Sequence, residues 1–280
     1  MTTTDFSPLR GPEWPAHVRF ALLVVLLAFC ALGGGASRPD VLSMALVKPA
    51  AILLGAFSLL LPGPFRWREL RTPLLLLVAL AAVIAIQLVP LPPTLWAWLP
   101  GHAQLMPVTD LAGQVWRPIS LAPDLTIASL TALSVPVAAL LLLAGISVER
   151  SWRLLPYLIG LVVLSALFGA GQIAGGPDSP FYLYRVTNTV SAVGLLANRN
   201  HQALLLALGI PMLAVWASFG REKQDRNAWQ RWMIAGTMSV LLLPILAVTG
   251  SRGGLIAAPV GLLIFWLLFR DWMGGTRSVR

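Results

Sequence analysis

The chain has 280 residues, of which 57% are hydrophobic and 11% charged, with a formal net charge of +9. So apolar a composition excludes an ordinary soluble domain and indicates a membrane protein. The basic residues are spread in small groups between apolar runs, which argues against the single basic patch of a nucleic-acid-binding protein.

A membrane-spanning helix needs about 20 mainly apolar residues, because the backbone in hydrocarbon must satisfy its own hydrogen bonds. Eight runs meet this requirement, at residues 18–35, 41–61, 73–89, 125–146, 154–174, 202–219, 233–249 and 255–269. The first run ends in small residues, as a signal peptide would, but the long leading segment with Asp5 and Glu13 favours an uncleaved span. We therefore expect an all-α, polytopic membrane protein with about eight transmembrane helices.

The connections between these runs differ in their content of Lys and Arg. Counted alternately, one set includes both termini and holds most of the basic residues, whereas the other set holds only Arg38, Arg117, Arg185, Arg199 and Arg252. Basic residues in short loops mark the cytoplasmic side. Both termini are therefore expected in the cytoplasm, with the long loops 90–124 and 175–200 on the outer face.

Lys48 lies within the second run and is followed by Pro49, which removes a backbone hydrogen bond. A charge at membrane depth costs about 2.5 to 3.5 kcal/mol on insertion scales, so its environment needs a reason. Two interpretations are open. The ammonium group extends to the outer headgroups, or it lines an internal site for an anion.

Arg252 stands in the very short connection Thr249-Gly250-Ser251-Arg252-Gly253-Gly254, between the last two runs. The following helix would point the positive end of its dipole at the same place as the guanidinium, which favours a phosphate there. The alternative is a plain turn whose arginine anchors to lipid headgroups.

The stretch Asn198-Arg199-Asn200-His201 occupies the matching position at the outer start of the sixth run. One asparagine is explained as a helix cap. Two amides, a guanidinium and an imidazole exceed what capping requires, and they suit a phosphorylated ligand rich in hydroxyl groups. His17, His102 and His201 are far apart in sequence, so we expect no metal site.

These two motifs together resemble those of the O-antigen ligase and polymerase family of bacterial inner-membrane proteins. The resemblance rests on the helix entry at 194–203, on the turn at 249–254, and on Trp116-Arg117-Pro118-Ile119-Ser120-Leu121-Ala122-Pro123-Asp124, which leads into a span. It extends over roughly residues 115–269. It divides the chain into a cytoplasmic segment 1–17, N-terminal helices 18–114, a ligase-like helical region 115–270 and a cytoplasmic tail 271–280.

The resemblance implies action on an undecaprenyl-diphosphate-linked glycan at the periplasmic face, in lipopolysaccharide or surface polysaccharide biosynthesis. A ligase moves the glycan to lipid A core and a polymerase lengthens it, by glycosyl transfer with no metal and no cofactor. Arg199 and Arg252 would contact the diphosphate, with Arg185 and Lys48 as further binding candidates. Asn198, Asn200 and His201 would bind sugar or phosphate oxygens, and the catalytic candidates are Arg252 and, as the base, His201.

Members of that family are longer and carry a functional histidine in a large periplasmic loop after the region that corresponds to Arg252. Because this chain ends at Arg280, we expect a protein that has lost transfer activity or that obtains the remaining part from a partner chain. The expected partners are the glycolipid, a lipid or glycan acceptor and membrane lipids, with no nucleic acid.

Two other classes stay open. The first is a transporter or channel-like protein in which Lys48 and the basic outer ends of the helices form a path for anions. The second is a structural subunit whose outer arginines only anchor to headgroups.

Overall fold

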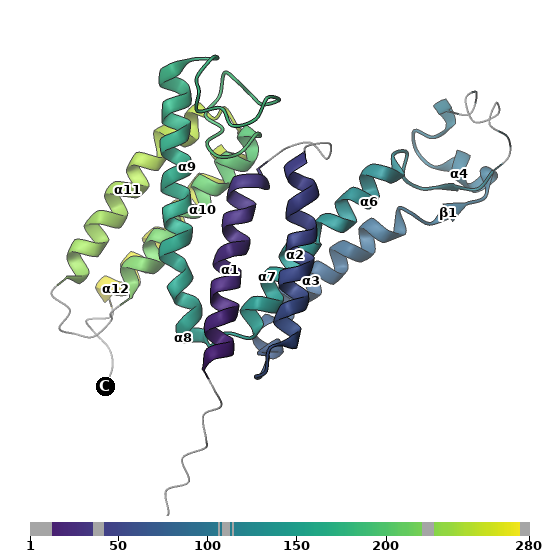
Figure 1. The fold of residues 1–280 in the computed structure, drawn as a ribbon. Helices are drawn as coiled ribbons and strands as arrows, with labels where there is room; N and C mark the ends of the chain where they lie inside the picture. Colours follow the sequence, from purple (N-terminus) through teal and green to yellow (C-terminus); the bar gives the residue numbers. More distant parts are fainter. Residues whose placement is uncertain are drawn as a thin grey trace, which may run out of the picture. The chain divides into compact units, whose positions relative to one another are not determined.

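The computed structural model describes residues 13–35, 42–105, 107, 113, 115–219 and 227–274, and helices dominate these ranges (Figure 1). Within them, seven helical segments are long and apolar enough to cross a membrane. The remaining expected span, 41–61, coincides with α2 (Leu42–Leu60), whose apolar segment Ala45–Leu60 is shorter than the other seven. The expected class, a helical protein with several membrane-spanning segments, is confirmed.

The chain forms two compact units. The first unit contains α1 (Trp14–Gly33) up to Leu26, and then Ala45–Ser147. It holds most of α2, and it also holds α3 (Trp67–Ile86), β1 (Pro90–Leu91), α4 (Pro93–Trp98), η1 (Ala103–Leu105), β2 (Arg117–Pro118), α6 (Pro123–Ala132) and α7 (Ser134–Ala144). The two short strands pair antiparallel, with Pro90 opposite Pro118. The boundary between the two compact units falls after Ser147 and follows packing. The boundary expected from the sequence, at residue 115, follows the family resemblance.

The expected span 125–146 is one membrane-crossing segment made of two helices. α6 ends at Ala132 and α7 begins at Ser134. Pro136 has no N–H group to donate to the carbonyl of Ala132, so the hydrogen-bond ladder is interrupted at this point. Leu133 stands between the two helices, and its N–H group bonds to the carbonyl oxygens of Leu130 and Thr131.

Arg19 lies in the first unit and is only 1% exposed. Its guanidinium donates hydrogen bonds to the carbonyl oxygens of Leu61 (2.6 Å), Ser58 (3.1 Å) and Pro62 (3.2 Å), at the end of α2. Carbonyl groups at a helix C-terminus have no partner within the helix and carry partial negative charge. Arg19 therefore joins α1 to the end of α2, and its charge is compensated by carbonyl oxygens.

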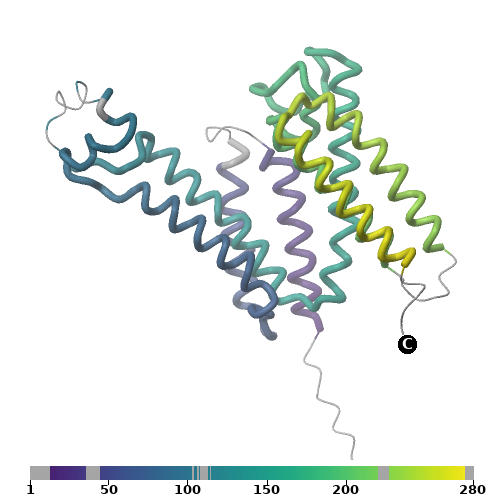
Figure 2. The backbone as a smooth tube through the Cα atoms, turned by 180° about the vertical axis from the view of Figure 1, so that it is seen from behind, coloured from purple at the N-terminus to yellow at the C-terminus, as the bar shows by residue number. Residues whose placement is uncertain are grey.

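The second unit contains the end of α1 and all residues from Val148 onward. Its helices are α8 (Val148–Ser151), η2 (Trp152–Leu154), α9 (Leu155–Gly175), α10 (Arg199–Ser218), α11 (Ala228–Val248) and α12 (Arg252–Gly274). α10 contacts α9, α11 and α12, and these helices lie next to one another in both views of the backbone (Figure 2). Half of its apolar window is buried, more than in any other candidate span. α10 therefore forms the centre of this unit.

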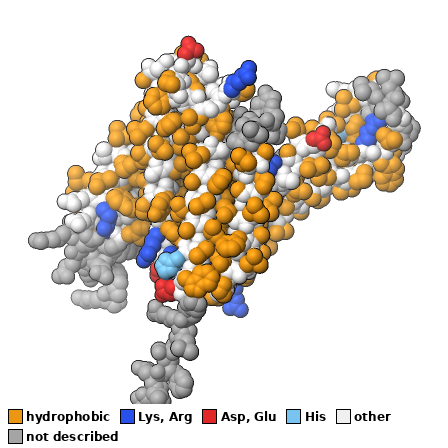
Figure 3. All heavy atoms as spheres, viewed as in Figure 1, with side chains coloured by type: hydrophobic (Ala, Val, Ile, Leu, Met, Phe, Trp, Pro, Cys, Tyr) orange, Lys and Arg blue, Asp and Glu red, His pale blue; other side chains and the backbone are white. Residues whose placement is uncertain are grey.

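Hydrophobic side chains cover most of the visible surface along the helices, and charged side chains are few (Figure 3). This surface suits hydrocarbon around the helices, because lipid tails do not penalise exposed leucine, isoleucine and valine. Several basic residues that indicate the orientation lie outside the described residues, namely Arg10, Arg38, Arg221, Lys223, Arg226, Arg277 and Arg280.

Candidate functional site

The loop 176–198 between α9 and α10 turns back into the second unit and buries residues 191–197, hereafter the buried segment. Ala192 and Val193 are at most 1% exposed, and Leu195 and Ala197 are nearly as well covered. This segment is not helical. Its backbone N–H and C=O groups therefore need partners from elsewhere, because unpaired backbone groups away from water are costly.

Gln172 of α9 supplies three of these partners, and one for Phe181 in the same loop, through one fully buried side chain. Its Oε1 accepts hydrogen bonds from the N–H groups of Val193 (2.9 Å) and Gly194 (2.8 Å). Its Nε2 donates to the carbonyl oxygens of Gly194 (2.8 Å) and Phe181 (2.9 Å). An amide has two donor hydrogens and two acceptor lone pairs, so the bonding capacity of Gln172 is filled.

Ser165 of α9 and Gln202 of α10 hold the next part of the buried segment. The Ser165 hydroxyl donates to Gln202 Oε1 (2.6 Å) and accepts from the N–H group of Leu195 (3.1 Å). Gln202 Nε2 donates to the Ser165 carbonyl (3.2 Å). A methyl group on Gly194, whose φ is +60°, would overlap with both side chains. The segment therefore requires glycine there.

Sequence reasoning missed Ser165, Gln172 and Gln202. The available signal was a polar side chain inside an apolar run, since Ser165 and Gln172 both lie within 154–174. Polar residues at membrane depth usually face the protein interior and find partners there. The pairing of Gln172 with a loop about 20 residues later could not be read from the sequence.

Side chains of the loop 176–198 itself also hold its path, through hydrogen bonds from Tyr182 and Thr187. The Tyr182 hydroxyl donates to the carbonyl oxygens of Thr189 (2.7 Å) and Ser191 (3.2 Å), and the Thr187 hydroxyl donates to Ala197 (2.9 Å). Burial raises the pKa of Tyr182, so its phenol stays protonated and can donate. The chain enters α10 from a fixed direction.

α10 begins with the predicted cap. Asn198 Oδ1 accepts a hydrogen bond from the N–H group of Asn200 (2.8 Å), which confirms the capping interpretation. A second amide also contributes, because Asn188 Oδ1 accepts from the N–H group of Arg199 (3.3 Å). Arg199, Asn200 and His201 are exposed in the first turn.

α12 begins at the short turn 249–254. Thr249 and Ser251 are fully buried there, and the Ser251 hydroxyl accepts from the N–H group of Gly254 (3.1 Å), as a helix cap does. Gly250 has a φ of +64°, which favours glycine. Arg252 is the first residue of the helix and is exposed.

The two helix starts lie together. A methyl group on Gly254 would overlap with Ala203 Cβ, and one on Gly261 would come within 2.8 Å of the Ala207 carbonyl, so α10 and α12 pack closely and run parallel. At the same end, Arg199 Nη1 lies 3.5 Å from where a Cβ of Gly250 would be. We call this end, where α10 and α12 begin, the loop end.

The loop end combines features that attract anions. Two helices of 20 and 23 residues point their positive dipole ends there. Arg199 adjoins the turn that carries Arg252, and Asn200 and His201 add exposed groups that can form hydrogen bonds. This arrangement can bind phosphate through guanidinium and amide donors.

Two other candidates belong to neither of these helix starts. Arg185 is exposed in the loop 176–198, away from its two ends in sequence. Lys48 belongs to the first unit, where its Nζ donates to the carbonyl of Ala128 (2.9 Å) and to the Thr131 hydroxyl (3.0 Å) of α6. Those two bonds explain how the cation is accommodated beside an apolar helix.

Among the residues that the structure describes, no group of three or more His, Cys, Asp or Glu side chains could hold a metal ion. No family model, no curated protein and no solved structure matches the chain. The loop end and the sequence motifs that form it are therefore the features that point to a function.

Proposed function

We propose that this chain is an O-antigen-ligase-like membrane protein that binds a polyprenyl-diphosphate-linked glycan at the loop end. The observation that carries the proposal is the convergence of two parallel helix starts with Arg199 beside the turn of Arg252. A diphosphate is a compact anion that such donors match well. The exposed Asn200 and His201 add hydrogen-bonding groups for sugar hydroxyls.

The proposed topology has eight spans, with α2 as the second, and both termini in the cytoplasm of a bacterium. The distribution of Lys and Arg between the connections supports it. In this orientation the loop end faces the periplasm from the inner membrane. Lipid-linked glycan and acceptor would meet there.

The proposed chemistry is glycosyl transfer. An acceptor hydroxyl oxygen forms a bond to the anomeric carbon while the bond from that carbon to the diphosphate oxygen breaks. The leaving diphosphate keeps the electron pair, and Arg199 and Arg252 stabilise its increased negative charge. The hydroxyl proton passes to a base, for which His201 is the candidate in this chain.

Binding of an undecaprenyl-diphosphate-linked oligosaccharide to the protein in nanodiscs tests the proposal. Arg199→Ala and Arg252→Ala should each weaken binding about tenfold, or roughly 1.4 kcal/mol, because each removes a charged donor. Arg270→Ala is the matched control, since Arg270 is an exposed arginine at the other end of α12. Unchanged binding in both test variants would refute the site.

The same reaction mixture separates binding from catalysis. Released diphosphate lipid, measured after addition of a glycan acceptor, indicates transfer. Binding without release would define a glycolipid-binding protein that lacks transfer activity.

A further inference from the structure

One side of α3 is exposed along its whole length. None of the apolar window of this helix is buried, whereas every other candidate span buries part of its own. The half-buried residues lie on the side that packs against α6 and α7, and they are Leu70, Leu77, Ala81 and Ile84. Residues three, four or seven positions apart share a face of a helix. A second face is exposed throughout, hereafter the free face, and consists of Arg68, Arg71, Leu75, Val78, Ala82 and Ile86.

The free face combines a charged end with an apolar remainder. Arg68 and Arg71 lie one turn apart at the start of the helix, and Leu75, Val78 and Ile86 are each more than half exposed. From Arg71 to Ile86 the helix extends about 22 Å, at about 1.5 Å per residue. Half of the hydrocarbon core of a bilayer is about 15 Å thick. The apolar part is therefore long enough for the acyl chains of one leaflet.

The three arginines at the start of α3 differ in what they contact. The N–H group of Arg66 donates to the Ala144 carbonyl (2.8 Å), and its guanidinium pairs with the Glu69 carboxylate. Arg68 and Arg71 make no hydrogen bond and no ion pair with another residue that the structure describes. The nearest carboxylate in sequence is thus already bound to Arg66. Two positive charges beside an apolar helix face are left without compensation.

An aromatic pair sets the level of these two charges in the membrane. Phe65 stacks on Trp67, with ring centroids 5.1 Å apart and planes at 11°. The guanidinium of the buried Arg19 lies 4.7 Å from the Phe65 centroid and ties this pair to the first unit. Trp67 is 40% exposed, and indoles of membrane proteins favour the headgroup level. Arg68 and Arg71 follow directly, where lipid phosphates lie.

The charge of the free face decides between its possible occupants. A second copy of this chain would insert in the same orientation, and a twofold axis would place both pairs of arginines at the same depth. These like charges repel one another. A zwitterionic phospholipid carries its own ammonium group and no net charge. An anionic phospholipid carries the negative charge that Arg68 and Arg71 lack, together with chains for the apolar part.

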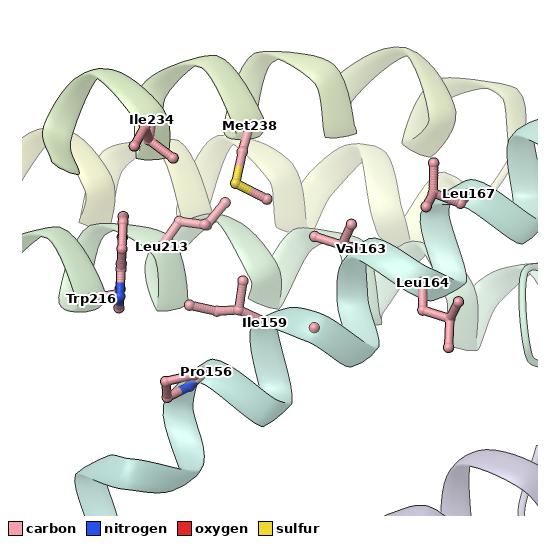
Figure 4. A pocket seen from close by; sticks show the side chains of 10 residues that line it. Pro156, Ile159, Val163, Leu164, Leu167, Leu213, Trp216, Ile234 and Met238 are labelled. Atoms are coloured by element: carbon pink, nitrogen blue, oxygen red, sulfur yellow. The ribbon is translucent and has the colours of Figure 1, made fainter. Parts of the chain in front are cut away.

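We propose that the free face of α3 binds an anionic phospholipid, with its phosphate at Arg68 and Arg71 and its acyl chains along Leu75 and Val78. In the proposed topology this lipid belongs to the cytoplasmic leaflet. The inference goes beyond the proposed function and does not depend on the loop end. A hollow of about 540 Å³ between α9, α10 and α11 offers no such selectivity, because no charged side chain lines it (Figure 4).

The test titrates delipidated protein in neutral detergent with phosphatidylglycerol or phosphatidylcholine and measures bound lipid by native mass spectrometry. Wild type should bind its first phosphatidylglycerol about thirtyfold more tightly than phosphatidylcholine. Arg68→Gln and Arg71→Gln should each lower this preference about fivefold, or about 1 kcal/mol per charge, and the double variant should abolish it. Because both side chains are exposed, unfolding in lipid-free detergent should not change.

Arg270→Gln is the matched control. Arg270 is an exposed arginine at the end of α12, and it pairs with Asp271 at 3.5 Å. The same loss of charge there should leave the preference within about twofold. Equal binding of the two lipids by wild type, an unchanged preference in the double variant, or the same loss in Arg270→Gln as in Arg68→Gln would overturn the inference.

A phosphatidylglycerol with a photoreactive group in the middle of one acyl chain gives a readout of position. In liposomes it should label peptides of α3 around Leu75 and Val78, and the double variant should lose most of that labelling. Excess phosphatidylglycerol should compete and excess phosphatidylcholine should not. A dimer cross-linked through α3 in place of lipid labelling would show that a second copy covers the free face, and would contradict the inference.

Discussion

Replacing Gln172 by leucine should release the buried segment while keeping a side chain of similar size in α9. The substitution leaves four backbone groups without their partner: the N–H groups of Val193 and Gly194 and the carbonyl groups of Gly194 and Phe181. A buried polar group left unpaired costs about 1 to 3 kcal/mol. Three of these groups belong to the buried segment, and since the segment can move toward water, we take the low end for each, which gives a loss of about 3 kcal/mol for closing the segment.

Hydrogen–deuterium exchange on residues 191–197 measures this loss directly. Exchange of protected amides follows the population of the open form, so about 3 kcal/mol corresponds to an exchange rate about 150-fold faster. Binding of the diphosphate lipid should fall with it, because the segment fixes the start of α10 and therefore Arg199.

The matched control is Gln87→Leu, since Gln87 is an exposed glutamine in the first unit, at the end of α3. It should leave exchange in the segment unchanged. Exchange within about threefold of wild type in Gln172→Leu would refute the reasoning, because it would mean that the amide does not hold the segment.

Three further substitutions follow from the contacts. Arg19→Leu should lower the free energy of unfolding in detergent by about 3 kcal/mol, because carbonyl groups at the end of α2 lose their donor, whereas Arg68→Leu, at an exposed arginine, should have little effect. Gly194→Ala should speed exchange in the buried segment at least about thirtyfold through overlap and a positive φ, unlike Gly236→Ala, which meets no atom. Lys48→Met should reduce stability by about 1.5 kcal/mol and leave glycolipid binding within about twofold. Loss of anion flux into liposomes in Lys48→Met, with glycolipid binding intact, would instead favour the transporter class.

Apolar runs in the sequence located the helices well because a spanning helix has little freedom in length or composition. The run 154–174 corresponds to α9 and the run 233–249 to α11, each to within a few residues at most ends. The division of the run 125–146 was not foreseen. It arises beside Pro136, which can be accommodated in one continuous helix or can end one, depending on packing.

The candidate site was predictable in part. Polar residues at helix starts stand out in an apolar chain, and this signal identified Asn198 to His201 and Ser251 to Arg252. Their approach to one another depends on Gly254 against Ala203, a contact between helices that are not consecutive, and no spacing rule gives it. The burial of residues 191–197 was missed because this segment is as apolar as the adjoining spans but too short to be a span itself.

The parallel packing of α10 and α12 has a consequence for how the protein is made. A ribosome delivers Arg199 to the membrane about fifty residues before Arg252, and α11 must turn back across the bilayer in between. Until α12 arrives and Gly254 meets Ala203, α10 presents its small-residue face to lipid or to insertion factors. Assembly of the two arginines thus waits for α12, and a nascent protein that stalls before α12 is built has a complete buried segment but only half of the proposed anion site.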